Sequence, residues 1–279
     1  MNLKETLKQH DFHFKKKYGQ NFITDTNLLR KIVSSADVGP DDIIVEIGPG
    51  AGTLTRALAS AAKCVIAIEI DAELAPIITE SLAGCDNFHL VLGDALDLDL
   101  DALVAEKTGA PARYKIVANL PYYITTPLVM HFLEQGFAID RIVIMVQREV
   151  AERFQAVPGT KAYGAVTVAL SYYGDVRLAF MVPRTLFTPQ PDVDSAVVDI
   201  RPYAQKPHEA RDPALFRQLV KAAFGQRRKT LSNALKASGL PPEALSQALD
   251  ECAIDPKRRG ETLSVAEFVA LSNVLDELR

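Results

Sequence analysis

The feature that most constrains the fold is a regular alternation of short apolar runs and amphipathic stretches, from residue 28 to about residue 200. Runs such as IIVEIG (43–48) and CVIAIEI (64–70) are almost continuously apolar and rich in β-branched residues, which is typical of strands buried on both faces. Stretches such as TLTRALASA (53–61) have the period of an amphipathic helix. Alternating strands and helices predict an α/β fold with a mainly parallel sheet covered on both faces.

The end of this region departs from the alternation. VRLAFMV (176–182) and SAVVDIRPY (195–203) are strand-like runs without a helix between them, which predicts an antiparallel pair at one edge of the sheet. The preceding stretch, AYGAVTVALSYYG (162–174), fits a helix or a strand equally well by periodicity alone.

A change of composition marks a second part of the chain. Residues 201–213 contain three prolines and mixed charges, which is typical of a linker. Only helical patterns follow, and DPALF and LSVAE supply polar capping residues before two of them. We therefore predict two domains, residues 1–203 and a small all-α domain of residues 204–279.

Composition also excludes several classes of protein. The chain has no run of apolar residues long enough to span a membrane, and its first residues lack the apolar centre of a secretory signal, so we expect a cytoplasmic protein. The three cysteines, Cys64, Cys85 and Cys252, are odd in number and far apart, which argues against a disulfide framework. No histidine, cysteine or acid spacing fits a metal site, so we predict none.

The charge distribution is uneven. The net charge of −4 argues against a nucleic-acid partner when taken alone. However, residues 221–236 carry five basic residues and no acid, and further basic clusters occur at residues 15–17 and 257–259. Each cluster alone could be a solvated surface, but three in an acidic chain favour an anion-binding surface.

Three motifs at the ends of successive strands point to an adenosine-bearing cofactor. Gly48, Gly50 and Gly52 follow the first strand, and such glycines let a backbone turn sharply and approach a ligand, although a purely structural turn also fits. Glu69 ends the next strand, where an acid can accept both hydroxyls of a ribose. Asp94 ends the third strand and can accept from the adenine amine, or cap a helix, or both.

NLPYYI (119–124) closes the fourth strand on the same edge of the sheet. If the Asn119 side-chain oxygen and the Leu120 carbonyl bind the two hydrogens of an adenine N6, the nitrogen can pyramidalise and direct its lone pair at an electrophilic methyl. Pro121 would fix the backbone, and Tyr122 would stack on a flipped base. The segment therefore predicts methyl transfer from a sulfonium, in which positioning does most of the work.

Motifs along almost the whole chain resemble the ribosomal RNA adenine dimethyltransferases, which use S-adenosylmethionine. The similar segments are KKKYGQNFITD, VEIGPGAGTLT, IEID, GDAL, NLPYYITTPL, VQREVAERF, KAYG, FTPQPDVDSAV and FGQRRKTL. The resemblance implies a Rossmann-like methyltransferase with a helical C-terminal domain. It also implies the substrate: two adjacent adenosines in a hairpin loop near the 3′ end of small-subunit rRNA, with a role in small-subunit biogenesis.

The resemblance assigns site residues. The cofactor contacts fall on Asn21, Ile23, Gly48, Gly50, Glu69, Asp94 and Asn119, and the target-base residues on Asn119, Leu120, Pro121, Tyr122 and Phe187. Phe187 would supply a second ring against the base, whereas Asp192 replaces a residue that is often basic in the family. Contacts with rRNA are expected from Lys15, Lys16, Lys17, Arg227, Arg228 and Lys229.

Three alternatives remain open. A related enzyme could modify large-subunit rRNA or DNA, although NLPY and the helical tail favour small-subunit rRNA. A NAD-dependent oxidoreductase would use the glycine loop and Glu69, but the loop G-P-G-A-G-T fits the dinucleotide fingerprint poorly. A non-catalytic assembly factor could use the basic clusters alone. We expect a monomer. We also expect it to dock on a preformed rRNA surface, since its negative net charge disfavours binding to naked RNA.

Overall fold

The computed structural model describes residues 10, 12 and 21–279, and the predicted RNA contacts Lys15, Lys16 and Lys17 lie outside them. The chain forms two compact units. One contains Met1–Ala151 and Val176–Pro202, and the other contains Glu152–Asp175 and Tyr203–Arg279. Within the described part of the chain, no helix combines the length and apolarity needed to cross a membrane.

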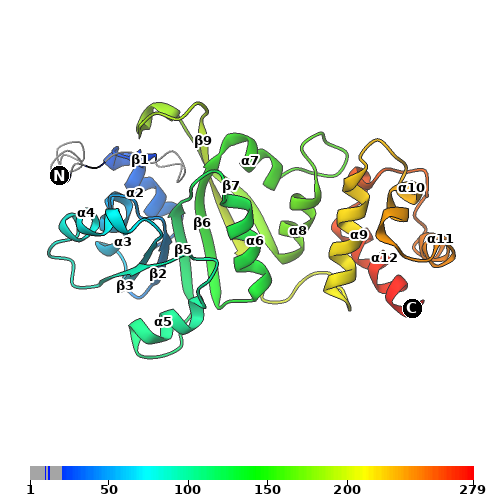
Figure 1. Cartoon of the computed structure of the whole chain (residues 1–279), viewed down its shortest axis with the longest axis horizontal. Helices are drawn as coiled ribbons and strands as arrows, with labels where there is room; N and C mark the ends of the chain where they lie inside the picture. Colours follow the sequence, from blue (N-terminus) through cyan, green and yellow to red (C-terminus); the bar gives the residue numbers. More distant parts are fainter. Residues whose placement is uncertain (1–9, 11, 13–20) are drawn as a thin grey trace. The chain divides into compact units, whose positions relative to one another are not determined.

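A seven-stranded sheet with the order β4-β3-β2-β5-β6-β9-β7 forms the centre of the first unit (Figure 1). Its strands are β2 (Ile43–Ile47), β3 (Cys64–Glu69), β4 (Phe88–Leu92), β5 (Tyr114–Asn119), β6 (Ile139–Gln147), β7 (Gly174–Val182) and β9 (Ser195–Pro202). The strands from β4 to β6 are parallel, whereas β9 pairs with β6 antiparallel. The mainly parallel sheet with antiparallel strands at one edge is confirmed.

Helices and 3-10 turns alternate with the strands, as the sequence pattern predicted. They are α2 (Thr26–Ser35), α3 (Thr53–Ala59), the 3-10 turn η2 (Ala72–Leu74), α4 (Ala75–Ser81), α5 (Leu100–Thr108), α6 (Thr125–Gln135), α7 (Arg148–Phe154) and the 3-10 turn η3 (Arg184–Leu186). All residues of β2 and β3 are buried, because helices cover both faces of the sheet. On one face, Leu28 of α2 and Leu58 of α3 pack in one core with Val65 of β3.

A separate two-stranded sheet was not predicted. β1 (Phe22–Ile23) pairs antiparallel with β8 (Phe187–Thr188), so that Ile23 lies opposite Phe187. Each strand has two residues, too few to show a period in the sequence. The pairing joins two segments that are far apart in the chain and that both belong to motifs shared with the methyltransferases.

The second unit is entirely helical apart from short connections. Its helices are α8 (Ala165–Tyr173), α9 (Pro213–Gly225), α10 (Leu231–Leu235), η4 (Lys236–Ser238), α11 (Pro242–Glu251), η5 (Gly260–Thr262) and α12 (Val265–Glu277). The predicted caps are present: Asp212 accepts from two amides of α9, and Ser264 forms a capping box with Glu267.

The ambiguous stretch before β7 is a helix, and it belongs to this second unit rather than to the first. Tyr172 of α8 is buried, and its ring centroid lies 4.5 Å from that of Phe216 in α9. The predicted boundary after residue 203 falls beside one division of the structure, and the compact units differ from the predicted ranges in that Glu152–Asp175 groups with the C-terminal helices. The reason is packing between Tyr163, Val168 and Tyr172 and the C-terminal helices, which no local pattern reveals.

Candidate active site

A pocket opens at the carboxyl ends of β2, β3, β4 and β5 in the first unit, where open α/β sheets bind ligands. Ten of the predicted site residues line it: Asn21, Ile23, Gly48, Gly50, Glu69, Asp94, Asn119, Leu120, Pro121 and Tyr122. Strand geometry explains the grouping, since parallel strands bring their final residues to one edge.

The glycine loop turns sharply at the end of β2. The Gly48 amide donates to the Ile68 carbonyl at 2.9 Å, which ends the pairing with β3. Gly50 has a φ of 60°, and a Cβ atom there would lie 2.7 Å from Cε1 of Phe22. Both the backbone conformation and the closeness of the Phe22 ring therefore require glycine at this position.

Glu69 is buried at the end of β3, where its carboxylate joins two backbone segments. Oε1 accepts from the Asp71 amide at 2.8 Å, and Oε2 accepts from the Gly50 amide at 3.3 Å. Burial raises the pKa of Glu69, while these backbone hydrogen bonds lower it in part. Each oxygen retains a further lone pair, so the side chain can still accept from two adjacent hydroxyl groups.

Asp94 lies in the turn after β4. Its Oδ1 accepts from the Leu96 amide at 3.0 Å, and the side chain faces the same pocket. The helix that follows begins at Leu100 and is capped by Asp99, so Asp94 is not its capping residue. Asp94 Oδ2 is therefore an acceptor that the local backbone does not use.

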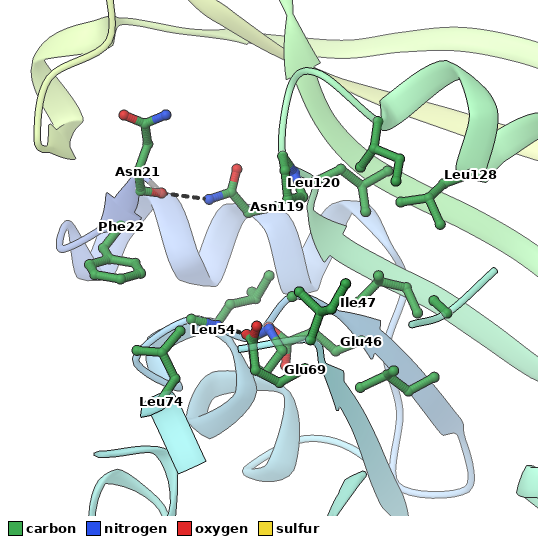
Figure 2. A pocket seen from close by; sticks show the side chains of 18 of the residues that line it. Asn21, Phe22, Glu46, Ile47, Leu54, Glu69, Leu74, Asn119, Leu120 and Leu128 are labelled. Carbon is green, nitrogen blue, oxygen red and sulfur yellow. Dashed lines mark hydrogen bonds between the residues drawn. The ribbon is translucent and has the colours of Figure 1, made fainter. Parts of the chain in front are cut away.

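Glu46 is a buried acid beneath the pocket, on the strand next to Glu69 (Figure 2). Only 1% of the residue is exposed, and no described residue satisfies its Oε2 atom by a hydrogen bond. Burial, opposed in part by the nearby Thr55 hydroxyl and reinforced by Glu69, raises the pKa of Glu46 to about 8. The glycine loop that follows β2 provides no partner for this oxygen.

Asn119 ends β5, and its amide is oriented by the N-terminal segment (Figure 2). Nδ2 donates to the Asn21 backbone carbonyl at 2.8 Å. A carbonyl can only accept, so the amino end of the amide must face Asn21 and Oδ1 must face away. Asn119 therefore presents an acceptor at the pocket edge, as its predicted role requires.

Residues 21–23 are held against the site by further contacts. The Ile23 carbonyl accepts from the Thr53 hydroxyl at 3.0 Å, and the Phe22 ring lies against Gly50. Together with the Asn21–Asn119 bond, these contacts fasten β1 to the glycine loop and to β5. The sequence assigned Asn21 and Ile23 to cofactor contacts and gave no sign of this second use of their carbonyls.

The turn after Asn119 fixes the rest of NLPYYI. The Pro121 carbonyl accepts from the Ile124 amide at 3.2 Å and from the Thr125 hydroxyl at 3.1 Å. Leu120 is buried, whereas Tyr123 is 58% exposed. Burial raises the pKa of Tyr122, and the Ser195 hydroxyl lowers it in part, so the phenol is protonated at neutral pH.

Phe187 does not line this pocket. The residue is only 4% exposed and packs in the core of the first unit, because its strand β8 is paired with β1. In this arrangement its ring does not face the pocket, and the sequence could not show this because the two-residue pairing leaves no pattern.

Arg227 has a different setting from the other predicted RNA contacts of the second unit. Its guanidinium donates to the carbonyls of Lys161 at 3.0 Å and Tyr163 at 2.8 Å, and it lies 3.4 Å from a Glu261 carboxylate oxygen. Arg228 and Lys229 are exposed. Arg227 thus ties two segments of its own unit together, which a run of basic residues cannot reveal.

Comparison with known proteins identifies the family. The model of the family described as ribosomal RNA adenine dimethylase matches residues 11–277. The chain belongs to this family. Curated relatives from Geobacillus thermodenitrificans and Clostridioides difficile, both named ribosomal RNA small subunit methyltransferase A, are 48% and 47% identical to it. Each alignment covers 98% of this chain and 94% of the relative.

Solved structures agree with this assignment. A dimethyladenosine transferase from Plasmodium falciparum superimposes with a TM-score of 0.75 at 25% identity, covering 90% of this chain and 95% of that one. The 23S rRNA methyltransferase ErmE gives a TM-score of 0.68 at 28% identity, covering 91% and 99%. The predicted family, the Rossmann-like methyltransferase fold and the enzyme class are confirmed, and the oxidoreductase alternative is wrong.

Proposed function

We propose that this enzyme uses S-adenosylmethionine to dimethylate N6 of two adjacent adenosines in a hairpin loop near the 3′ end of small-subunit rRNA. The observation that carries the proposal is the orientation of the Asn119 amide, whose Oδ1 faces away from the Asn21 carbonyl at the edge of an acid-lined pocket. A role in small-subunit biogenesis, a cytoplasmic location and a monomeric state are part of the proposal.

The acids of the pocket fit the cofactor. When bound, S-adenosylmethionine supplies a methyl group on a positively charged sulfonium. Glu69 has free lone pairs for a ribose diol, and Asp94 Oδ2 is available for the adenine amine. The unpaired Oε2 of Glu46 adds an acceptor at the base of the pocket, where a cation would relieve the cost of burying a carboxylate.

Residues of the turn after β5 fit the target base. Asn119 Oδ1 would accept one hydrogen of the adenine N6, and the Leu120 carbonyl would accept the other. Tyr122, whose phenol is held by Ser195, would stack on the base. These residues orient the amine, and none of them needs to remove a proton before the transfer.

The choice of substrate rests on the relatives. Proteins named for the small subunit are 44–49% identical to this chain over 92–96% of their length. The 23S rRNA methyltransferase ErmE is more distant at 28% identity. Large-subunit rRNA is therefore the second candidate. Arg228 and Lys229, which are exposed, would contact the rRNA backbone, as would Lys15, Lys16 and Lys17.

The test is transfer of labelled methyl groups from S-adenosylmethionine to purified small and large subunits that lack the modification. We expect incorporation into the small subunit that approaches about four methyl groups, two on each base. Asn119→Ala should lower the rate by about 100-fold or more, as removal of a positioned hydrogen-bonding group does at other active sites. Labelling of large subunits alone would contradict the proposal.

A further inference from the structure

Tyr122 is an aromatic residue of the pocket, and its polar end contacts another element of the same unit. Its phenol oxygen lies 2.7 Å from Oγ of Ser195, within hydrogen-bonding distance. The two residues are far apart in sequence, one in the turn after β5 and the other at the first position of β9. Nothing in the chemistry of methyl transfer requires a hydroxyl at Ser195 itself.

Ser195 is held rigidly. The residue is fully buried, and it faces Gln147 in the register between β9 and β6. The preceding residue, Asp194, is also held at both its side chain and its backbone. Its carboxylate accepts from the Arg184 amide, and its backbone carbonyl accepts from the Arg148 amide, each at 3.0 Å. The backbone at the start of β9 therefore holds Ser195 in place, and its hydroxyl is a fixed hydrogen-bonding partner for Tyr122.

A stationary partner restricts the ring of Tyr122. The phenol oxygen lies at the far end of the ring, so fixing it and the backbone together sets the direction of the ring axis. The phenolic O–H also prefers the plane of the ring, so the bond disfavours rotation about that axis. Ser195, being fully buried, would in turn lack a partner for its hydroxyl without the phenol.

We propose that Ser195 is a positioning residue, which holds the ring of Tyr122 in the orientation that stacks on the target adenine. The inference rests on the proposed function, since it needs a base at Tyr122. Two groups would then be preset before the substrate arrives: the Asn119 amide by the Asn21 carbonyl, and the Tyr122 ring by the Ser195 hydroxyl. A preset ring spends less binding free energy on ordering the site.

The test compares Ser195→Ala, Tyr122→Phe and the double variant in methyl transfer to small subunits at saturating S-adenosylmethionine. Each single variant should lower kcat by roughly three- to tenfold, the equivalent of one hydrogen bond, with KM nearly unchanged. The double variant should lose no more than either single one, because both remove the same bond. Ser272→Ala, which truncates another fully buried serine, is the matched control and should leave kcat unchanged.

A spectroscopic measurement separates positioning from general damage. In protein labelled with 13C at tyrosine Cζ, the Tyr122 resonance is identified by its loss in Tyr122→Phe. It should shift in Ser195→Ala and not in Ser272→Ala. A shifted resonance with wild-type kcat would overturn the inference, as would a double variant whose loss equals the product of the two single losses.

Two further outcomes keep this inference separable from the proposed function. If Ser195→Ala does not fold, Tyr122→Phe removes the same bond from the other side, and a wild-type kcat in that variant overturns the inference. If wild-type enzyme is active and Tyr122→Ala is inactive while both bond-removing variants behave as wild type, only the positioning role fails. A wild-type enzyme that transfers no methyl to small subunits overturns the proposed function and the inference together.

Discussion

Charged groups are used in opposite ways in the pocket of the first unit and in the helical unit. In the pocket, Glu46, Glu69 and Asp94 have no basic partner among the residues that the structure describes, and they keep acceptor positions open. In the helical unit, four arginines are paired with acids of the same unit. These pairs are Arg211–Glu277, Arg227–Glu261, Arg258–Glu267 and Arg279–Asp212.

The difference separates binding from structural roles. A buried carboxylate oxygen without a partner, such as Oε2 of Glu46, destabilises the fold, and Glu69 and Asp94 keep further acceptor positions open beside it, so this pocket is arranged for something that binds there. An arginine that already bonds to its own unit has fewer donors left for a partner. We therefore propose ligand binding for the pocket acids and a mainly structural role for Arg227.

The largest expected effect concerns Glu46. Its folded-state pKa of about 8 lies above the ordinary value of 4.5, so the folded protein keeps a proton that the unfolded chain loses. Stability contributed by this group is therefore present below pH 4.5, falls as the pH rises, and is lost above pH 8. Over that window the loss is on the order of 5 kcal/mol.

Glu46→Gln should remove this part of the pH dependence. Because other groups titrate in the same range, the quantity to compare is the difference in unfolding free energy between the variant and the wild type, measured by denaturant between pH 5 and 9. The variant should gain stability relative to the wild type as the pH rises. A difference that stays constant with pH would show that Glu46 is ionised in the folded protein.

The second effect concerns cofactor affinity. Glu69→Ala should weaken binding of S-adenosylmethionine by about 100-fold, since it removes charged hydrogen-bond acceptors from a buried site. Asp86→Ala, which changes an exposed acid of the same unit, should bind as the wild type does. Binding of the Glu69 variant to small subunits should persist, and its loss together with cofactor binding would show that docking depends on the filled pocket.

The third effect concerns the packing of β1 on the glycine loop. Gly50→Ala should lower the unfolding free energy by about 2 to 3 kcal/mol, because it combines an unfavourable φ with a clash against the Phe22 ring. Gly84→Ala is a control for backbone strain alone, because Gly84 has a φ of 84° and open space around it. Equal losses in the two variants would mean that Phe22 moves aside without cost.

The smallest effect separates Arg227 from its neighbour. Arg227→Ala should lower the stability of the protein by about 1 kcal/mol, through lost hydrogen bonds to two carbonyls. Arg228→Ala should leave stability unchanged and instead reduce the salt dependence of small-subunit binding, as expected for a phosphate contact. If both variants affected subunit binding equally and neither affected stability, the distinction between paired and free basic residues would be wrong.

The sequence was sufficient to predict most of the strands and helices, and to predict that several strand-end residues lie together. Continuous apolar runs such as that of β2 identify buried strands, and the parallel order brings Gly48, Glu69, Asp94 and Asn119 to one edge of the sheet without any knowledge of packing. Residues at strand ends are therefore predictable as a group.

Contacts between distant short segments were not predictable. The two-residue pairing of β1 with β8 buries Phe187. The Arg227 guanidinium donates hydrogen bonds to the Lys161 and Tyr163 carbonyls. Ser195 and Thr53 were missed as parts of the site, because a hydroxyl at a strand or helix start has many uses. One signal was available for Ser195, a polar residue directly before three apolar strand residues.

The most direct test of cofactor binding by the pocket acids is a calorimetric titration of the wild-type enzyme and the Glu69→Ala variant with S-adenosylmethionine. We predict a single site in the wild type and a loss of about 100-fold in affinity in the variant. We also predict proton release at neutral pH, because the bound cation favours ionised Glu46. Equal affinity in the two proteins would contradict the claim that the unpaired acids of the pocket bind the cofactor.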